Sequence, residues 1–128
     1  MFSAYFNQAQ QQGIRLETKI ASLNTLPVEE SELAIVLANA LENAIHANKD
    51  LPPGQKEIRC KMVGTPSVMV ELSNPYTTPV TFNDQGLPVS SKEGHGFSVQ
   101  SIAAFCKKHG AVCQFEAAEG RFCLKLVL

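Results

Sequence analysis

The order of apolar and polar residues along the chain predicts a succession of strands and helices. From residue 14 to residue 20 apolar and charged side chains alternate, which predicts a strand with one buried face. From residue 29 to about residue 48 the period changes to about 100° per residue, which predicts a helix with one apolar stripe. That stripe consists of Leu33, Val36, Leu37, Ala40, Leu41, Ala44 and Ala47. Two prolines and a glycine at residues 52–54 end this helical unit.

The second half of the chain repeats the two patterns around one irregular segment. Two strands are predicted at residues 58–62 and 68–72, joined by a turn at residues 64–66. From residue 75 to residue 93 the periodicity disappears among three prolines and small polar residues, so we predict a lid or a binding loop at about 76–94. A second helix is predicted at residues 97–109, with Gly110 just beyond it. A closing hairpin with strands at 112–117 and 122–128 turns around Glu119 and Gly120.

Five strands and two helices predict an α/β (α+β) fold, a two-layer sandwich with a mixed five-stranded sheet. Two helices cannot cover both faces of a five-stranded sheet, so we expect both on one face and a largely solvated opposite face. A chain of 128 residues suits one such domain. We assign residues 13–128 to this domain and residues 1–12 to the remnant of a preceding helix or linker.

Composition narrows the possible partners. The formal net charge of −1 favours neither a nucleic-acid backbone nor an anionic membrane. We find no apolar run long enough to span a bilayer and no apolar stretch typical of a signal peptide, so we expect a soluble domain. The four cysteines form no C-x-x-C pair, which favours buried reduced thiols over disulfides or a zinc site and, with them, a cytoplasmic location.

Three amide and imidazole side chains on the first predicted helix are candidates for binding. Asn39 and Asn43 are four residues apart and His46 follows three residues later, so all three lie along one edge of the apolar stripe. A buried asparagine needs hydrogen-bond partners, and a neighbouring loop could supply them as well as a ligand could. The spacing alone leaves both interpretations open.

Two further signals surround the irregular segment. Gly94 and Gly96 directly precede the second helix, where free N–H groups favour a phosphate, although glycines also simply end loops. Asn74 ends a strand before Pro75, a position typical of a turn residue. Each signal is weak alone, and their order along the chain makes them more specific together.

In that order the three segments resemble the GHKL ATPase superfamily. Residues 37–47 are similar to its N-box, and residues 94–102 are similar to its second glycine box. The chain most resembles the catalytic domains of sensor histidine kinases with the Bergerat fold, in the subgroup of Gram-positive peptide-pheromone receptor kinases. In that subgroup an asparagine such as Asn74 replaces the aspartate of the D-x-G-x-G box. The resemblance extends over about residues 9–128.

The resemblance implies a protein-histidine kinase that binds ATP and Mg²⁺. Asn43 would coordinate the metal and Asn39 would support it or a phosphate, since amide oxygens suit this hard cation. Asn74 would contact adenine. The lid residues Lys92, Gly94, His95 and Gly96 would lie near the phosphates, with Lys92 equally explained as a solvated charge. Glu42 would either polarise the accepting histidine or remain a solvated charge.

The implied partners lie outside this sequence. The γ-phosphoryl group would pass to a histidine on the protein's own dimerisation helices and then to a response regulator, in a homodimeric and membrane-anchored parent protein. None of the three histidines here lies in the H-E-x-x type of sequence that carries the phosphate. Neither nucleic acid nor direct membrane contact is expected of this domain.

Departures from the family pattern keep a second hypothesis open. The hydrolysing branch of the superfamily has a glutamate where Asn39 stands, and an amide cannot act as the base for an attacking water. Phe97 and Ser98 replace residues of the usual glycine box, with Ser98 able to cap a helix. The alternative is therefore a degenerate domain that senses nucleotide or docks partners without kinase activity.

Overall fold

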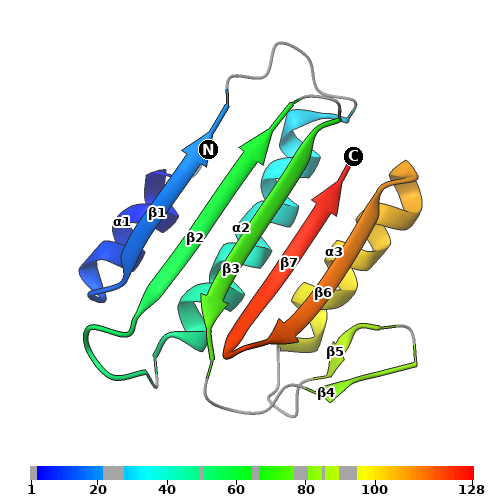
Figure 1. Cartoon of the computed structure of the whole chain (residues 1–128). Helices are drawn as coiled ribbons and strands as arrows, with labels where there is room; N and C mark the ends of the chain where they lie inside the picture. The colour runs from blue at the N-terminus through cyan, green and yellow to red at the C-terminus, as the bar shows by residue number, and fades with distance from the viewer. Residues whose placement is uncertain are drawn as a thin grey trace.

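A five-stranded sheet with helices on one face forms the body of the protein (Figure 1). The computed structural model describes residues 3–21, 28–49, 51–64, 67–76, 81–84, 86–89 and 95–128, and for residues 3, 30, 89 and 95–98 it describes only the backbone. The sheet has the order β1-β2-β3-β7-β6. Its strands are β1 (Arg15–Ile20), β2 (Glu57–Val63), β3 (Met69–Pro75), β6 (Val112–Ala118) and β7 (Arg121–Val127). Only the β1–β2 pair is parallel, so the sheet is mixed as expected.

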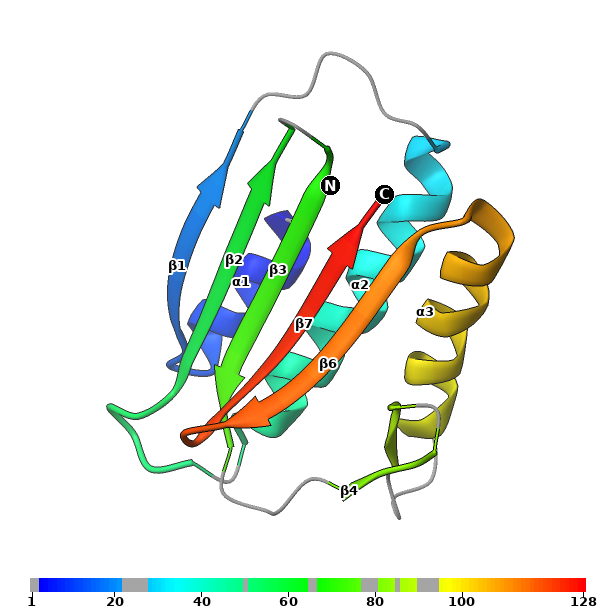
Figure 2. The same ribbon diagram turned by 45° about the vertical axis from the view of Figure 1, so that its right-hand side comes forward.

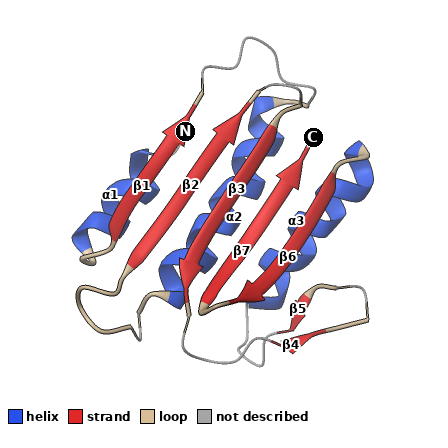
Figure 3. Cartoon of the chain, in the orientation of Figure 1, coloured by secondary structure: helices blue, strands red, loops and turns tan. Residues whose placement is uncertain are grey.

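Three helices lie behind the sheet and leave its other face open (Figures 2 and 3). They are α1 (Ser3–Gln11), α2 (Glu30–Ala47) and α3 (His95–His109). The two-layer fold with helices on one face is confirmed, and α1 adds a third helix to the two predicted in the body. Ala9 of α1 is 1% exposed and belongs to the core, so this helix packs as part of the domain.

The core lies between the helices and one face of the sheet. Along β2 the apolar side chains at every second position are buried against the helices, while the intervening Arg59 and Lys61 are exposed on the open face. The predicted apolar stripe of α2 is buried from Leu33 to Ala44, whereas Ala47 at its end is exposed. All four cysteines are free, as predicted, with Cys60 and Cys106 buried and the other two half-buried.

Two predictions about local structure are corrected. The strand at residues 14–20 is buried only at its start, because β1 is an edge strand and Ile20 is 46% exposed. The supposedly irregular segment contains a small hairpin of β4 (Thr81–Phe82) and β5 (Pro88–Val89). Its turn is stabilised by the Asn83 side chain, which accepts a hydrogen bond from the Leu87 N–H at 3.0 Å. Short polar segments of this kind carry no hydrophobic period, so the pattern alone does not reveal them.

The closing hairpin is confirmed. Glu119 and Gly120 form its two-residue turn with φ angles of 55° and 75°. The turn predicted at residues 64–66 falls partly outside the described residues. Among the helices that the structure describes, none is long and apolar enough to cross a membrane.

Candidate functional site

The side of α2 that faces α3 is fixed by ion pairs between the two helices. Glu32, near the start of α2, accepts a hydrogen bond from Lys108 Nζ at 2.9 Å and contacts the His109 ring nitrogen. Both partners lie in the last turn of α3, and the His109 ring also packs on Phe105 at a centroid distance of 4.7 Å. The hydrogen bonds with Lys108 and His109 keep the pKa of the Glu32 carboxyl below its usual value. The Glu32 side of α2 therefore points toward α3.

Asn39 and Asn43 lie on the same side of α2 as Glu32. They follow it by seven and eleven residues, which places them within about 20° of its direction around the helix axis. Asn43 is about 16 Å along α2 from Glu32, and α3 runs back in the opposite direction over about 21 Å (Figure 2). Asn43 therefore lies level with the first turns of α3. Both amides are half-buried, as is the side chain of His46 near the end of α2.

Glu42 lies elsewhere on the helix. It is rotated by about 100° from Asn43 and is exposed to solvent, whereas the two asparagines are not. The structure thus separates Glu42 from the amide pair, as the helical period predicted. Its carboxylate is accessible to a partner approaching from outside the domain.

Asn74 occupies the end of β3, at the same end of the molecule as the last turns of α2 and the start of α3 (Figures 1 and 2). It alternates with the buried Val70 and Leu72, so its side chain points to the helix-covered face and is 3% exposed. The amide Nδ2 donates a hydrogen bond to the Pro75 carbonyl at 2.9 Å. This bond leaves the amide oxygen as the group that can accept from a ligand's amino group. The expectation that Asn74 is a turn residue is wrong in this respect, because it belongs to the strand and the core.

The glycine box opens α3. The helix begins at His95, two residues before the predicted start, so Gly96 lies in its first turn and Ser98 lies within the helix. Ser98 therefore does not take the helix-capping position suggested by the sequence. The first turn of any α-helix has N–H groups without intrahelical partners, and these attract anions. Lys92 and Gly94 lie outside the described residues, as does the side chain of His95.

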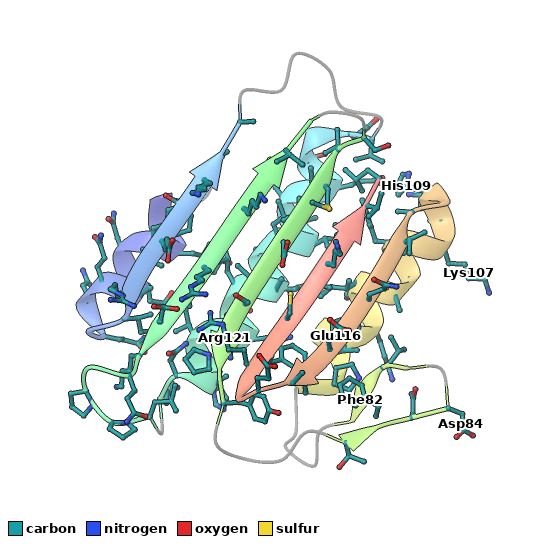
Figure 4. All side chains as sticks on the ribbon, viewed as in Figure 1. Phe82, Asp84, Lys107, His109, Glu116 and Arg121 are labelled. Carbon is teal, nitrogen blue, oxygen red and sulfur yellow. The ribbon has the colours of Figure 1, made fainter. Side chains whose placement is uncertain are left out.

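The β4–β5 hairpin lies at this end of the domain too. Figure 4 places Phe82 on the part of the hairpin next to the body and Asp84 at its outer end. Phe82 is half-buried and Asp84 is exposed. Four elements thus converge at this end: the last turns of α2, the end of β3, the start of α3 and the hairpin.

Asn48, which the sequence analysis did not single out, fixes the end of α2 against the sheet. It is 0% exposed, and its Nδ2 donates to the carbonyl oxygens of Ala44 at 2.7 Å and Glu57 at 3.3 Å. Its Oδ1 accepts from the Glu57 N–H at 2.9 Å. The side chain thereby caps the helix and pairs with β2 as a neighbouring strand would. The only sequence signal is an asparagine directly after the helix, a common helix-ending position.

Glu57 itself is the centre of a charge cluster on the open face. Its side chain is 7% exposed and pairs with Arg15, with Arg59 at 2.8 Å and with Arg121 at 2.9 Å. Arg121 also donates to Ser73 Oγ at 3.0 Å, which ties β7 to β3 (Figure 4 shows Arg121 on this face). The hydrogen bond from Arg15, aided by the other two guanidinium groups, holds the pKa of Glu57 below its usual value of 4.5 despite partial burial. This cluster joins four strands and lies on the face opposite the helices.

The amide oxygens at the end of the domain where the four elements converge suit a metal ion that takes most of its ligands from outside the protein. Among the residues that the structure describes, no group of three or more His, Cys, Asp or Glu side chains could hold a metal ion alone. Asn43 and Asn39 offer neutral amide oxygens at half-buried positions. Mg²⁺ commonly takes one or two protein oxygens together with phosphate oxygens and waters. These residues therefore fit Mg²⁺ carried by a nucleotide, and they do not form a complete metal site by themselves.

Comparison with known proteins defines the family. The GHKL domain family matches residues 28–128, so the chain belongs to this family. No curated protein is significantly similar to the chain in sequence. The matched residues include all four elements that converge near Asn43.

Solved structures of histidine kinases share the fold. The catalytic domain of histidine kinase ThkA has a TM-score of 0.77 at 14% identity, covering 99% of this chain and 85% of that chain. The cytoplasmic segment of histidine kinase QseC has a TM-score of 0.68 at 15% identity, covering 98% and 68% respectively. The mycobacterial sensor histidine kinase MprB has a TM-score of 0.67 at 15% identity, covering 99% and 91%. The chain is thus a GHKL domain that resembles histidine kinase catalytic domains, with the Bergerat-type fold that the sequence predicted.

Proposed function

We propose that this domain binds Mg²⁺-ATP and acts as the catalytic domain of a two-component sensor histidine kinase. The observation that carries the proposal is which side of α2 faces α3. Because Glu32 contacts Lys108 and His109, the side of α2 with Asn39 and Asn43 is turned toward the start of α3. Amide oxygens, helical N–H groups and the buried Asn74 then lie at one end of the domain.

Each residue has a chemical task in this proposal. The Asn43 amide oxygen would hold Mg²⁺, which would offset the negative charge of the nucleotide phosphates. Asn39 lies one turn earlier and would support the metal site or contact a phosphate. The first turn of α3, with Gly96, presents N–H groups to the phosphates, and Lys92, Gly94 and His95 belong to the same nucleotide-binding segment.

Asn74 recognises the base. Its Nδ2 is held by the Pro75 carbonyl, so Oδ1 accepts a hydrogen bond from the adenine amino group. Asn74 is buried, so a base that binds it moves from water into the apolar environment of the core. This makes the hydrogen bond a means of selecting adenine.

The phosphoryl acceptor and partners come from outside this domain. The γ-phosphoryl group is transferred to a histidine on the dimerisation helices of a homodimeric sensor and then to a response regulator, on the cytoplasmic side of the membrane. Glu42 is exposed about 100° around α2 from Asn43, where the accepting histidine of an incoming helix would contact it. Asn39 replaces the glutamate that would activate water, which supports transfer to a histidine over hydrolysis.

A calorimetric titration tests nucleotide binding. We expect Asn43→Ala to lose the Mg²⁺-dependent part of ATP binding and to retain its circular dichroism spectrum. Asn7→Ala is the matched control, because Asn7 is an exposed asparagine on α1. The same affinity in folded Asn43→Ala as in the wild type would show that the amide pair does not form the site.

One observation favours a second candidate function, that of a nucleotide sensor without kinase activity. Phe97 and Ser98 depart from the glycine box, and both lie within α3, where glycine would be more flexible. A longer chain with its phosphate-accepting helices distinguishes the two functions. A kinase labels its histidine from radioactive γ-phosphate ATP, whereas a sensor binds ATP and transfers nothing.

A further inference from the structure

Four apolar side chains form a continuous row across the open face of the sheet. The strand register makes them neighbours in the order Val63 (β2), Met69 (β3), Val127 (β7) and Val112 (β6). Along each strand these residues, here called the apolar row, alternate with residues of the hydrophobic core or packed against it. Their side chains therefore point away from the helices. Figures 1 and 2 show that no helix that the structure describes covers this face.

The apolar row is partly exposed to solvent. Val112 is 56% exposed, and the other three side chains are half-buried. Single exposed apolar side chains such as Ile35 on α2 are common on protein surfaces, whereas four neighbours in register form a continuous patch. Apolar patches with a polar border are typical of surfaces that bind another molecule.

A row of mostly basic residues borders the apolar row. Two residues nearer the middle of the strands, the register continues across the sheet with Lys19, Lys61, Glu71, Lys125 and Gln114, here called the lysine row. Among the described residues, none of these three lysines forms an ion pair, whereas the arginines of the same face pair with glutamates. The lysine row therefore offers positive charge directly beside apolar side chains.

The open face as a whole is positive, although the chain is not. Its strands carry six cationic side chains on this face against four carboxylates, a balance of +2, while the whole chain has a net charge of −1. The cationic residues are Arg15, Lys19, Arg59, Lys61, Arg121 and Lys125. The carboxylates are those of Glu17, Glu57, Glu71 and Glu116. Two copies of such a face repel each other, whereas an acidic partner is attracted.

We propose that the apolar row and the lysine row together bind an amphipathic helix of a partner protein, whose apolar stripe is flanked by acidic residues. At the usual strand spacing, the apolar row extends about 14 Å across its four strands, the length of about ten helical residues. The lysine row runs parallel to it about 7 Å away, two residues along each strand. A helix about 10–12 Å in diameter that covers the apolar row brings the carboxylates of one flank close to the lysines.

The same features disfavour an anionic membrane as the occupant. The carboxylate of Glu71 lies in the lysine row between Lys61 and Lys125, where it would face the lipid phosphates. The inference does not depend on nucleotide binding. The apolar row crosses β3 at its first residue, Met69, whereas Asn74 lies near the other end of that strand and points to the opposite face.

Nuclear magnetic resonance of the isotopically labelled whole chain tests the proposal with a synthetic peptide. The probe is a helical peptide of about 18 residues, built from leucine, alanine and glutamate, with one leucine stripe flanked by glutamates. We expect it to shift the backbone resonances of the apolar row and of Lys61 and Lys125. Two control peptides should bind at least about ten-fold more weakly. One has lysine in place of every glutamate, and the other has the same composition without the stripe.

Matched variants locate the contact. Lys61→Glu reverses a charge in the lysine row and should weaken binding of the acidic peptide about five-fold. Lys107→Glu makes the same change at an exposed position on α3 and should retain the wild-type affinity. Val112→Thr places a hydroxyl in the apolar contact and should weaken binding about three-fold. Ile35→Thr is its control, because Ile35 is exposed on the helix side of the molecule. Circular dichroism should show all four variants folded.

Several results would overturn the proposal. One is a set of shifts centred elsewhere or equal affinity for the lysine peptide, and another is a loss in a control variant as large as in its counterpart. Binding to vesicles of phosphatidylserine and phosphatidylcholine, lost in Lys61→Glu and without peptide binding, would assign the face to a membrane instead. A dimer in analytical ultracentrifugation that Val112→Thr dissociates would assign it to a second copy of the chain.

Discussion

Replacing Asn48 with alanine should destabilise the domain more than any other single asparagine substitution on α2. Its side chain makes three hydrogen bonds, to Ala44 and to both backbone groups of Glu57, and is fully buried. Alanine removes all three bonds and leaves the Glu57 N–H and C=O and the Ala44 carbonyl in an interior without the side-chain partner. The exposed Asn7, by contrast, has no such role in the packing.

The magnitude follows from these bonds. A neutral hydrogen bond contributes about 0.5–1.5 kcal/mol net, and a buried group left unpaired costs about 1–3 kcal/mol. Some of the freed groups will recover a water, so we expect a loss of about 2–4 kcal/mol in the free energy of unfolding. Marginal stability makes this a large fraction of the total for a domain of this size.

Urea denaturation followed by circular dichroism measures the effect. The midpoint should fall in Asn48→Ala while the slope with denaturant stays the same, since the surface exposed on unfolding is unchanged. Asn7→Ala should lie within about 0.5 kcal/mol of wild type. A loss below about 0.5 kcal/mol in Asn48→Ala would refute the argument that this side chain holds α2 to β2.

Three further predictions follow from the site and the charge clusters. Asn74→Leu should lower ATP affinity about ten-fold, because adenine loses its hydrogen-bond acceptor, and calorimetry giving wild-type affinity would remove Asn74 from the base site. The chain alone should not label itself with radioactive γ-phosphate, because none of its histidines lies in an acceptor sequence; acid-labile phosphate on any of them would contradict this. The lowered pKa of Glu57 means that its contribution to stability is present above its usual pKa of 4.5 and is lost as pH falls through the folded value. The melting temperatures of wild type and Glu57→Gln should therefore begin to converge as pH falls below 4.5; a difference that stays constant at lower pH would exclude this linkage.

The strongly periodic elements could be predicted from sequence because burial imposes their period. The apolar stripe of α2 and the alternation in β2 and β3 are direct consequences of one buried face. The two-layer arrangement follows from counting strands against helices. Asn39 and Asn43 were identified by spacing, and their half-buried positions agree with the predicted edge of the stripe.

The remaining features depend on contacts between distant residues. Which side of α2 faces α3 depends on the contacts of Glu32 with Lys108 and His109. No local sequence pattern predicts these contacts. The Asn48 bonds depend on where β2 starts after an intervening loop. The helical position of Ser98 was missed because a glycine-containing segment gives no periodic signal at a helix start.

Nuclear magnetic resonance of the isotopically labelled chain tests the central claim most directly. Magnesium and a non-hydrolysable ATP analogue are titrated together, and backbone shifts are mapped onto the domain. The account predicts the largest changes at residues 39–46, at Asn74 and in the first turns of α3. Changes centred instead on Glu57 and the open face, or no changes at saturating nucleotide, would contradict the assignment of this end of the domain as the ATP site.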